Sequence, residues 1–193
     1  MTGKAEEKRN YIRIYDHVLL RLTPLSREEF EKKLENFREG KESPWIDPIR
    51  PPGEIFKLES YLKRLREKDR ELAGVLQILN QKLDRILINL LGEKFLKGFR
   101  EVEVNLGAGG LRVRLPEEVQ VGAIYEIDLG LLPDWVFLKT FGEVIRVEPS
   151  PEGGYEVAFK FIWITEADQD RLVEHIFRQQ VLQLRATRRV KKD

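Results

Sequence analysis

Hydrophobic and polar residues along this chain follow two different periods, and the change of period divides the chain. Alternation with a period of two, typical of strands with one buried face, marks residues 14–22 and five segments after residue 98. Those five segments are 100–105, 110–115, 123–128, 135–147 and 155–164. Six strands at hairpin spacing predict a small antiparallel β-barrel. A C-terminal amphipathic helix capped by Thr165 or Asp168 follows them, so the expected class is α+β.

A period of 3.5 residues marks the segment between residues 54 and 98. One aspartate and nine leucine or isoleucine residues recur there at alternating spacings of four and three: Leu58, Leu62, Leu65, Asp69, Leu72, Leu76, Leu79, Leu83, Ile86 and Leu90. An unbroken heptad register predicts one long helix that self-associates through a left-handed coiled coil, as a dimer to tetramer. Asp69 would fix the register or occupy a hydrated layer. The alternative is a helix lying on the core of its own domain.

The chain between the first strand and the heptad segment contains a second kind of helix signal. Ser26 and Glu29 form a capping-box pattern that begins a short amphipathic helix ending near Glu39, and a Pro-rich connector follows. The predicted organisation therefore has four parts. They are an N-terminal motif with the first strand (1–24), the short helix and connector (25–53), the inserted heptad helix (54–98), and the rest of the barrel with the C-terminal helix (99–193).

Composition narrows the classes of function. Lys and Arg total 34 against 33 Asp and Glu, so neither nucleic acid nor a membrane is expected as a partner. No cysteine is present, and the amino terminus lacks the apolar core of a signal peptide, which predicts a soluble, cytoplasmic protein. The two histidines, His17 and His175, lie far apart, and no nucleophile elbow or paired-carboxylate signature occurs. We therefore expect no enzyme activity, no metal and no cofactor.

The remaining chemistry lies in two short segments. Arg9 and Arg13 are four residues apart, and forked guanidinium donors bind phosphates and stack on aromatic rings. Asn105 precedes a glycine-rich turn, 107–110, whose missing Cβ atoms permit close approach to the backbone and positive φ. A dinucleotide fingerprint is excluded because Arg112 stands where its third glycine belongs. These parts suit a small, planar, doubly charged nucleotide; the alternative is a hairpin without a ligand and two solvated arginines.

The order of these features resembles the PilZ domain, the bacterial receptor module for cyclic di-GMP. Arg9-Asn10-Tyr11-Ile12-Arg13 matches the RxxxR motif of that family, and the segment 105–110 matches its (D/N)xSxxG motif at Asn105 and Gly110, with Gly107 in place of the serine. The resemblance covers about residues 8–24 and 99–190. It implies that Arg9 and Arg13 clamp the phosphates and stack on the guanines. Asn105 would then bind a guanine edge, with Gly107 and Gly110 in the adjoining turn.

Two departures from the family pattern leave a rival open. Loss of the serine removes one hydrogen bond, worth roughly 0.5–1.5 kcal/mol net, or about tenfold in affinity. The motifs are also separated by the heptad insertion, and the resemblance includes members that oligomerise through such helices, some without binding the nucleotide. The leading hypothesis is an oligomeric cyclic di-GMP receptor that signals to a protein partner in motility or surface behaviour. The rival is a ligand-free adaptor, and a nucleic-acid-binding barrel is a third reading that near-neutral charge disfavours.

Overall fold

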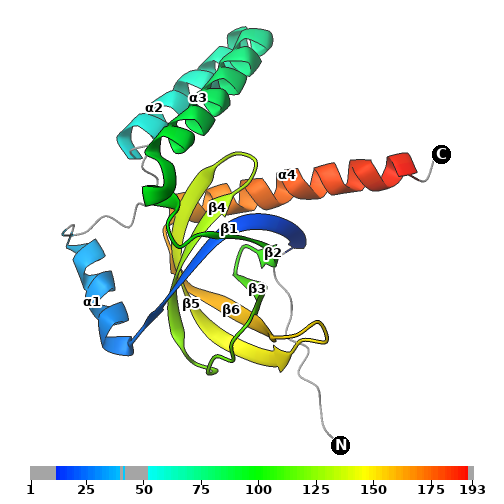
Figure 1. The fold of residues 1–193 in the computed structure, drawn as a ribbon. Helices are drawn as coiled ribbons and strands as arrows, with labels where there is room; N and C mark the ends of the chain where they lie inside the picture. Colours follow the sequence, from blue (N-terminus) through cyan, green and yellow to red (C-terminus); the bar gives the residue numbers. More distant parts are fainter. Residues whose placement is uncertain (1–11, 40, 42–51, 191–193) are drawn as a thin grey trace, which may run out of the picture. The chain divides into compact units, whose positions relative to one another are not determined.

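The computed structural model describes residues 12–39, 41 and 52–190, and its strands form a closed barrel. The strands are β1 (Arg13–Leu25), β2 (Arg100–Gly107), β3 (Gly110–Leu115), β4 (Ile124–Leu131), β5 (Val136–Pro149) and β6 (Tyr155–Ile164). Their order around the barrel is β1-β2-β3-β6-β5-β4 (Figure 1). The predicted six-stranded barrel is therefore confirmed, and β3 and β6 begin and end at the predicted residues.

The interior of the barrel is filled by the alternate positions that the period of two indicated. Leu106, Leu111 and Phe159 are fully buried and occupy one continuous row across β2, β3 and β6. Because successive side chains in a strand point to opposite faces, the residues on either side of this row face outward. This alternation decides which residues of the glycine-rich turn are available to a ligand.

The chain divides into two compact units. The first takes in the described residues of 1–17, 103–125 and 141–193, and the second those of 18–102 and 126–140. In the first unit, helix α4 (Glu166–Val190) is preceded by Thr165, whose hydroxyl accepts a hydrogen bond from the Asp168 amide at 3.1 Å. The Nε2 atom of His175 lies 2.6 Å from Asp16 Oδ2, so α4 is joined to the first residues of β1.

Helix α1 (Arg27–Arg38) belongs to the second unit and has the predicted start. The Ser26 hydroxyl accepts from the Glu29 amide at 3.2 Å, and the Glu29 carboxylate accepts from the Ser26 amide at 2.7 Å. The hydrogen bond from the Ser26 backbone amide to the Glu29 carboxylate, and then one from the Ser26 side chain, lower the pKa of Glu29. Both partners of the capping box are therefore present.

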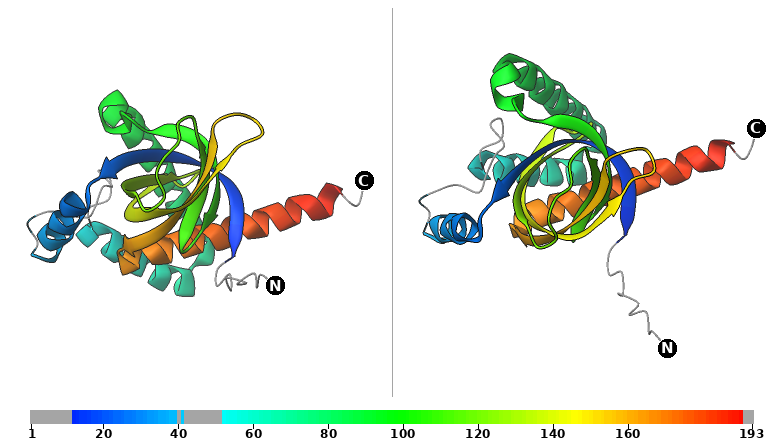
Figure 2. Two further views of the ribbon diagram at one scale, coloured as in Figure 1. Left: turned by 90° about the horizontal axis from the view of Figure 1, so that it is seen from below. Right: turned by 60° about the horizontal axis from the view of Figure 1, so that its bottom comes forward.

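The heptad segment differs from its prediction, because it forms two helices rather than one. Helix α2 (Pro52–Lys68) and helix α3 (Arg70–Leu96) are separated at Asp69 and lie side by side (Figures 1 and 2). Arg66 donates to Gln77 Oε1 at 2.6 Å, a contact that eleven residues of straight helix would prevent. Asp69 has an extended backbone, and its carboxylate accepts from the Leu72 amide at 2.9 Å. It is therefore the N-cap of α3, not a residue of a continuous seam.

Helix α3 carries a broad apolar face that nothing in the described chain covers. Ala73 is fully buried, but eight large apolar side chains between residues 72 and 90 are 41 to 76% exposed. They include Leu72, Val75, Leu76, Ile78, Leu79, Leu83, Ile86 and Leu90. Within the described chain, no helix combines the length and apolar character that crossing a membrane requires.

Candidate functional site

The glycine-rich segment forms a tight hairpin in the first unit, and its residues Gly107, Ala108 and Gly110 are buried. Strands β2 and β3 are joined by two residues, Ala108 and Gly109, with Gly107 paired to Gly110. The same register places Asn105 opposite Arg112. Strand β6 continues both rows, with Lys160 opposite Gly110 and Ala158 opposite Arg112. The predicted ligand residue Asn105 therefore lies in the same row as Arg112, and the glycines lie in the neighbouring row.

The structure brings the second arginine of the N-terminal motif to this hairpin. A Cβ atom built on Gly107 would lie 3.0 Å from Arg13 Cγ and 3.7 Å from Arg13 Nε. The exposed side chain of Arg13 therefore lies against the glycine at which the family motif has a serine. Arg9, the other arginine of the motif, lies outside the described residues.

The glycines of the turn serve close packing rather than unusual backbone angles. Positive φ occurs at Gly98, Gly122, Gly153 and Gly154, and not at the three glycines of the hairpin, so the hairpin does not use the positive φ that glycine permits. At Gly110, a Cβ atom would collide with the carbonyl oxygen of Phe159 in β6. Glycine at 110 thus allows β3 and β6 to approach each other.

Two residues that sequence reasoning did not select complete this face. The Arg112 guanidinium donates to the Tyr15 hydroxyl at 3.1 Å, and its Nε lies 3.5 Å from Glu156 Oε2. Tyr15 is 58% exposed, and its backbone carbonyl accepts from Gln183 of α4 at 2.8 Å. The alternation of β1 and β3 placed both side chains outward, but their proximity depends on a register that the sequence did not reveal.

The heptad residues proposed for oligomerisation fall into two groups. Leu62 and Leu65 on α2 are half-buried, whereas those from Leu72 onward on α3 are exposed. The side chain of Leu58 lies outside the described residues. The exposed group keeps the alternating four and three spacing along one uninterrupted helix, so the register continues over α3 alone.

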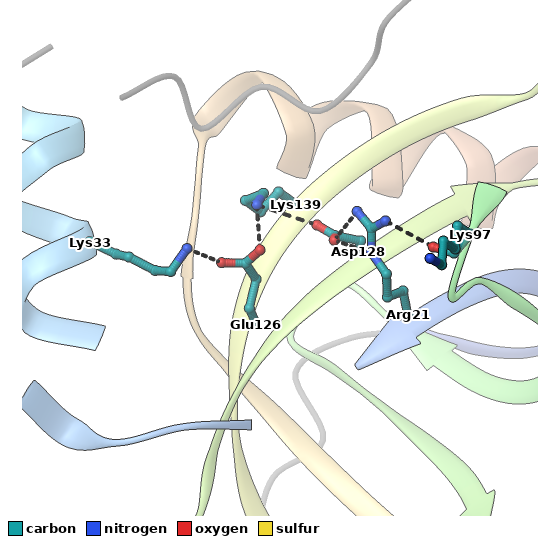
Figure 3. Close-up of polar contacts among 6 residues, drawn as sticks. All are labelled: Arg21, Lys33, Lys97, Glu126, Asp128 and Lys139. Atoms are coloured by element: carbon teal, nitrogen blue, oxygen red, sulfur yellow. Dashed lines mark hydrogen bonds and ion pairs between the residues drawn. The ribbon is translucent and has the colours of Figure 1, made fainter. Parts of the chain in front are cut away.

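The second unit contains a buried ionic cluster, which Figure 3 shows. Glu126 Oε1 lies 2.5 Å from Lys139 Nζ, and Glu126 Oε2 lies 2.9 Å from Lys33 Nζ of α1. Arg21 donates twice to Asp128 Oδ2, at 2.9 and 2.7 Å, and to the carbonyl of Lys97 at 3.3 Å. Burial would raise the pKa of Glu126, but hydrogen bonds from Lys139 and Lys33 and their charges outweigh burial and lower it. The charges of this cluster pair with one another. Lys33 links α1 to β4, Lys139 links β5 to β4, and Arg21 links β1 both to β4 and to Lys97, the residue that follows α3.

Known proteins resemble this chain in sequence and in fold. Residues 85–178 match the PilZ domain family, and no curated protein matches the sequence. A pathogenic protein from Xanthomonas campestris, a tetrameric PilZ domain self-assembled via a helical bundle, is similar at a TM-score of 0.53. The two are 17% identical over 91% of this chain and 92% of that one. The Bacillus subtilis inhibitor of motility, MotI/DgrA, is 21% identical over 44% of each chain, at a TM-score of 0.39.

The matched residues begin within α3 and run into α4, so they include β2 to β6 and the glycine-rich hairpin. Strand β1, with Arg13, precedes the matched residues and completes the same barrel. The closed six-stranded barrel therefore has the PilZ fold, and residues 85–178 carry the sequence signature of a PilZ domain.

Proposed function

We propose that this chain is a PilZ-type receptor for cyclic di-GMP that self-associates through α3 and signals to a protein partner in the cytoplasm. The ligand site consists of Arg9, Arg13, Asn105, Gly107 and Gly110. The observation that carries the proposal is the contact of Arg13 with Gly107, because it joins two motifs whose contacting residues are 94 positions apart in the chain (107 − 13). Cyclic di-GMP is the ligand class of the PilZ family, which consists of receptor and adaptor domains rather than enzymes.

The chemistry of the five residues supports this ligand. Arg13 supplies charge-assisted hydrogen bonds to a phosphate and a planar surface for a base. Asn105 faces outward one row from the glycines and offers both a donor and an acceptor to a guanine edge. A ligand that bound the hairpin would have to share or displace the position that Arg13 occupies over Gly107. Ligand binding therefore changes the exposed start of β1, where a partner protein would detect it.

Titration calorimetry with cyclic di-GMP tests the proposal. We expect saturable binding by the wild-type chain and a loss of at least tenfold in affinity for Arg13→Ala, since a charge-assisted hydrogen bond contributes about 1.5–3 kcal/mol. Arg146→Ala is the matched control, because Arg146 is an exposed arginine of the same unit on β5. No heat with wild type at high micromolar ligand contradicts the receptor, and equal affinities of the two variants contradict the assigned site.

A second candidate function is a ligand-free adaptor that acts through protein contacts. Two observations favour it: Gly107 replaces the motif serine, and the apolar face of α3 is exposed. The similar Xanthomonas protein is a tetramer self-assembled via a helical bundle. An adaptor predicts self-association without heat on titration of the nucleotide, so the same calorimetry distinguishes the two functions.

A further inference from the structure

Arg112 stands in the centre of the outward face that carries the proposed ligand residues. It lies directly opposite Asn105 on β2, and Cβ atoms of opposite residues in antiparallel strands are roughly 4.5–5.5 Å apart. The row beside it contains Gly107 and Gly110, and the side chain over Gly107 is that of Arg13, itself a proposed ligand residue. A group bound by Asn105 therefore lies within reach of the Arg112 guanidinium.

The guanidinium of Arg112 is held in place before any ligand arrives. Its terminal nitrogen donates to the Tyr15 hydroxyl at 3.1 Å, and Glu156 Oε2 lies 3.5 Å from its Nε. The Tyr15 backbone is fixed in turn by the 2.8 Å hydrogen bond from Gln183. An arginine held by two partners loses less conformational freedom on binding than a solvated one, because its planar fork is already oriented.

The donors of an arginine match one purine and not the other. Guanine presents two acceptors, O6 and N7, to a bidentate guanidinium, whereas adenine presents an amino donor at the place of O6. Asn105 supplies an acceptor and a donor for the opposite edge of the same base. The exposed ring of Tyr15 also offers a face on which a base stacks.

We propose that Arg112, held by Tyr15 and Glu156, is the residue through which this site prefers guanine to adenine. This inference rests on the proposed receptor function, because it concerns the same ligand site. It adds a third arginine, on β3, to the two arginines of the N-terminal motif.

The test is titration calorimetry of wild type and Arg112→Lys with cyclic di-GMP and, separately, with cyclic di-AMP. Lysine retains the charge but not the fork, so we expect the affinity for cyclic di-GMP to fall about ten- to a hundredfold while that for cyclic di-AMP is unchanged. Tyr15→Phe removes the hydroxyl and is expected to lower cyclic di-GMP affinity several-fold. Arg114→Ala is the control, since Arg114 lies two residues along the same face and pairs with Glu152.

The outcomes separate this inference from the function on which it rests. If wild type binds neither nucleotide, the receptor function fails and the assignment of Arg112 fails with it. If wild type binds cyclic di-GMP and Arg112→Lys keeps the same ratio of the two affinities, only the role of Arg112 is overturned. An equal loss of affinity for both nucleotides in Arg112→Lys also overturns the role of Arg112, and so does a loss of the same size in Arg114→Ala. Either result indicates an effect of positive charge in general, or of disturbed structure, rather than recognition of guanine.

Discussion

Gly107 lies where the N-terminal motif meets the hairpin, and its missing side chain leaves space that Arg13 occupies. A Cβ atom at this position would be 3.0 Å from Arg13 Cγ and 3.3 Å from the Ile12 carbonyl oxygen, closer than most carbon contacts. Ile12 and Arg13 are both exposed, and they would have to shift by a few tenths of an ångström to accept a side chain at 107. The glycine thus lets Arg13 rest where the family motif places a hydroxyl.

Substituting Gly107 by serine and by alanine separates the effect of the hydroxyl from that of the added carbon. Both variants move Arg13, whereas only serine supplies the missing hydrogen bond. We expect Gly107→Ser to bind cyclic di-GMP up to about tenfold more tightly than Gly107→Ala, from a bond worth roughly 0.5–1.5 kcal/mol. Calorimetry measures the difference, and indistinguishable affinities would show that the hydroxyl makes no contact with the ligand.

Glu126 is a carboxylate of the ionic cluster that contacts two lysines, Lys139 and Lys33. Glu126→Gln removes the carboxylate that Lys139 and Lys33 both contact and leaves Lys139 with Asp128, 3.6 Å away. We expect it to lower the free energy of unfolding by about 2–3 kcal/mol at pH 7. Urea denaturation measures this loss. Glu148→Gln, at an exposed glutamate 3.7 Å from Arg146, is the control and is expected to change stability by less than about 0.5 kcal/mol.

The lowered pKa of Glu126 also determines how stability depends on pH. Its carboxylate is protonated at lower pH in the folded than in the unfolded protein, so its contribution is complete above the unfolded pKa of about 4.3. That contribution is lost as the pH falls through the lower folded pKa. Denaturation series below pH 5 should therefore show a smaller fall in stability for Glu126→Gln than for wild type. Parallel curves would contradict the assigned pKa direction.

At the scale of whole elements, Asp69 determines that the heptad segment is two helices. Its carboxylate caps α3, and loss of an N-cap costs about 1 kcal/mol. We expect Asp69→Ala to lower the free energy of unfolding of the α2–α3 pair by about 1 kcal/mol. Asp69→Asn keeps a side-chain oxygen, so we expect it to have little effect. Circular dichroism at the helical wavelength measures both. A more stable Asp69→Ala would indicate that a continuous helix is the preferred state.

Asp69 also illustrates which elements the sequence could predict. Strand positions followed from alternation, and α1 and α4 from caps at Ser26 and Thr165, because these signals involve residues close together in the chain. Heptad spacing continues through Asp69 without a gap. The spacing alone therefore did not distinguish one continuous helix, with Asp69 in its apolar seam, from two helices with Asp69 as the N-cap of the second. The contacts of Arg13 with Gly107 and of Tyr15 with Arg112 depend on strand register across the barrel. Only the contact between Arg13 and Gly107 was predicted, through the family motif. The contact between Tyr15 and Arg112 was not, because the sequence of a single strand does not determine its register with its neighbours.

At the scale of the whole molecule, the apolar face of α3 favours association of several chains. The residues from Leu72 to Leu90 repeat at heptad spacing on one helix, and monomeric proteins rarely expose a continuous apolar surface of this kind. Ala73 is buried in the structure of the single chain, so α2 covers a different face of α3 from the one that carries these leucines. A second copy that contributes its own α3 would bury them without disturbing the α2–α3 contact.

The last prediction follows from this arrangement. Leu76→Asp/Leu83→Asp places two charges about two helical turns apart on the exposed face, and we expect it to convert a wild-type oligomer into a monomer. A buried unpaired charge costs several kcal/mol, which exceeds what the remaining apolar contacts restore. Multi-angle light scattering gives the mass directly, and Val121→Asp, at an exposed apolar residue outside α3, should leave the oligomer intact. A monomeric wild type would contradict self-association through α3. Retention of cyclic di-GMP binding by the monomeric variant would show that the ligand site and the helical interface work independently, since no residue of the site lies on α3.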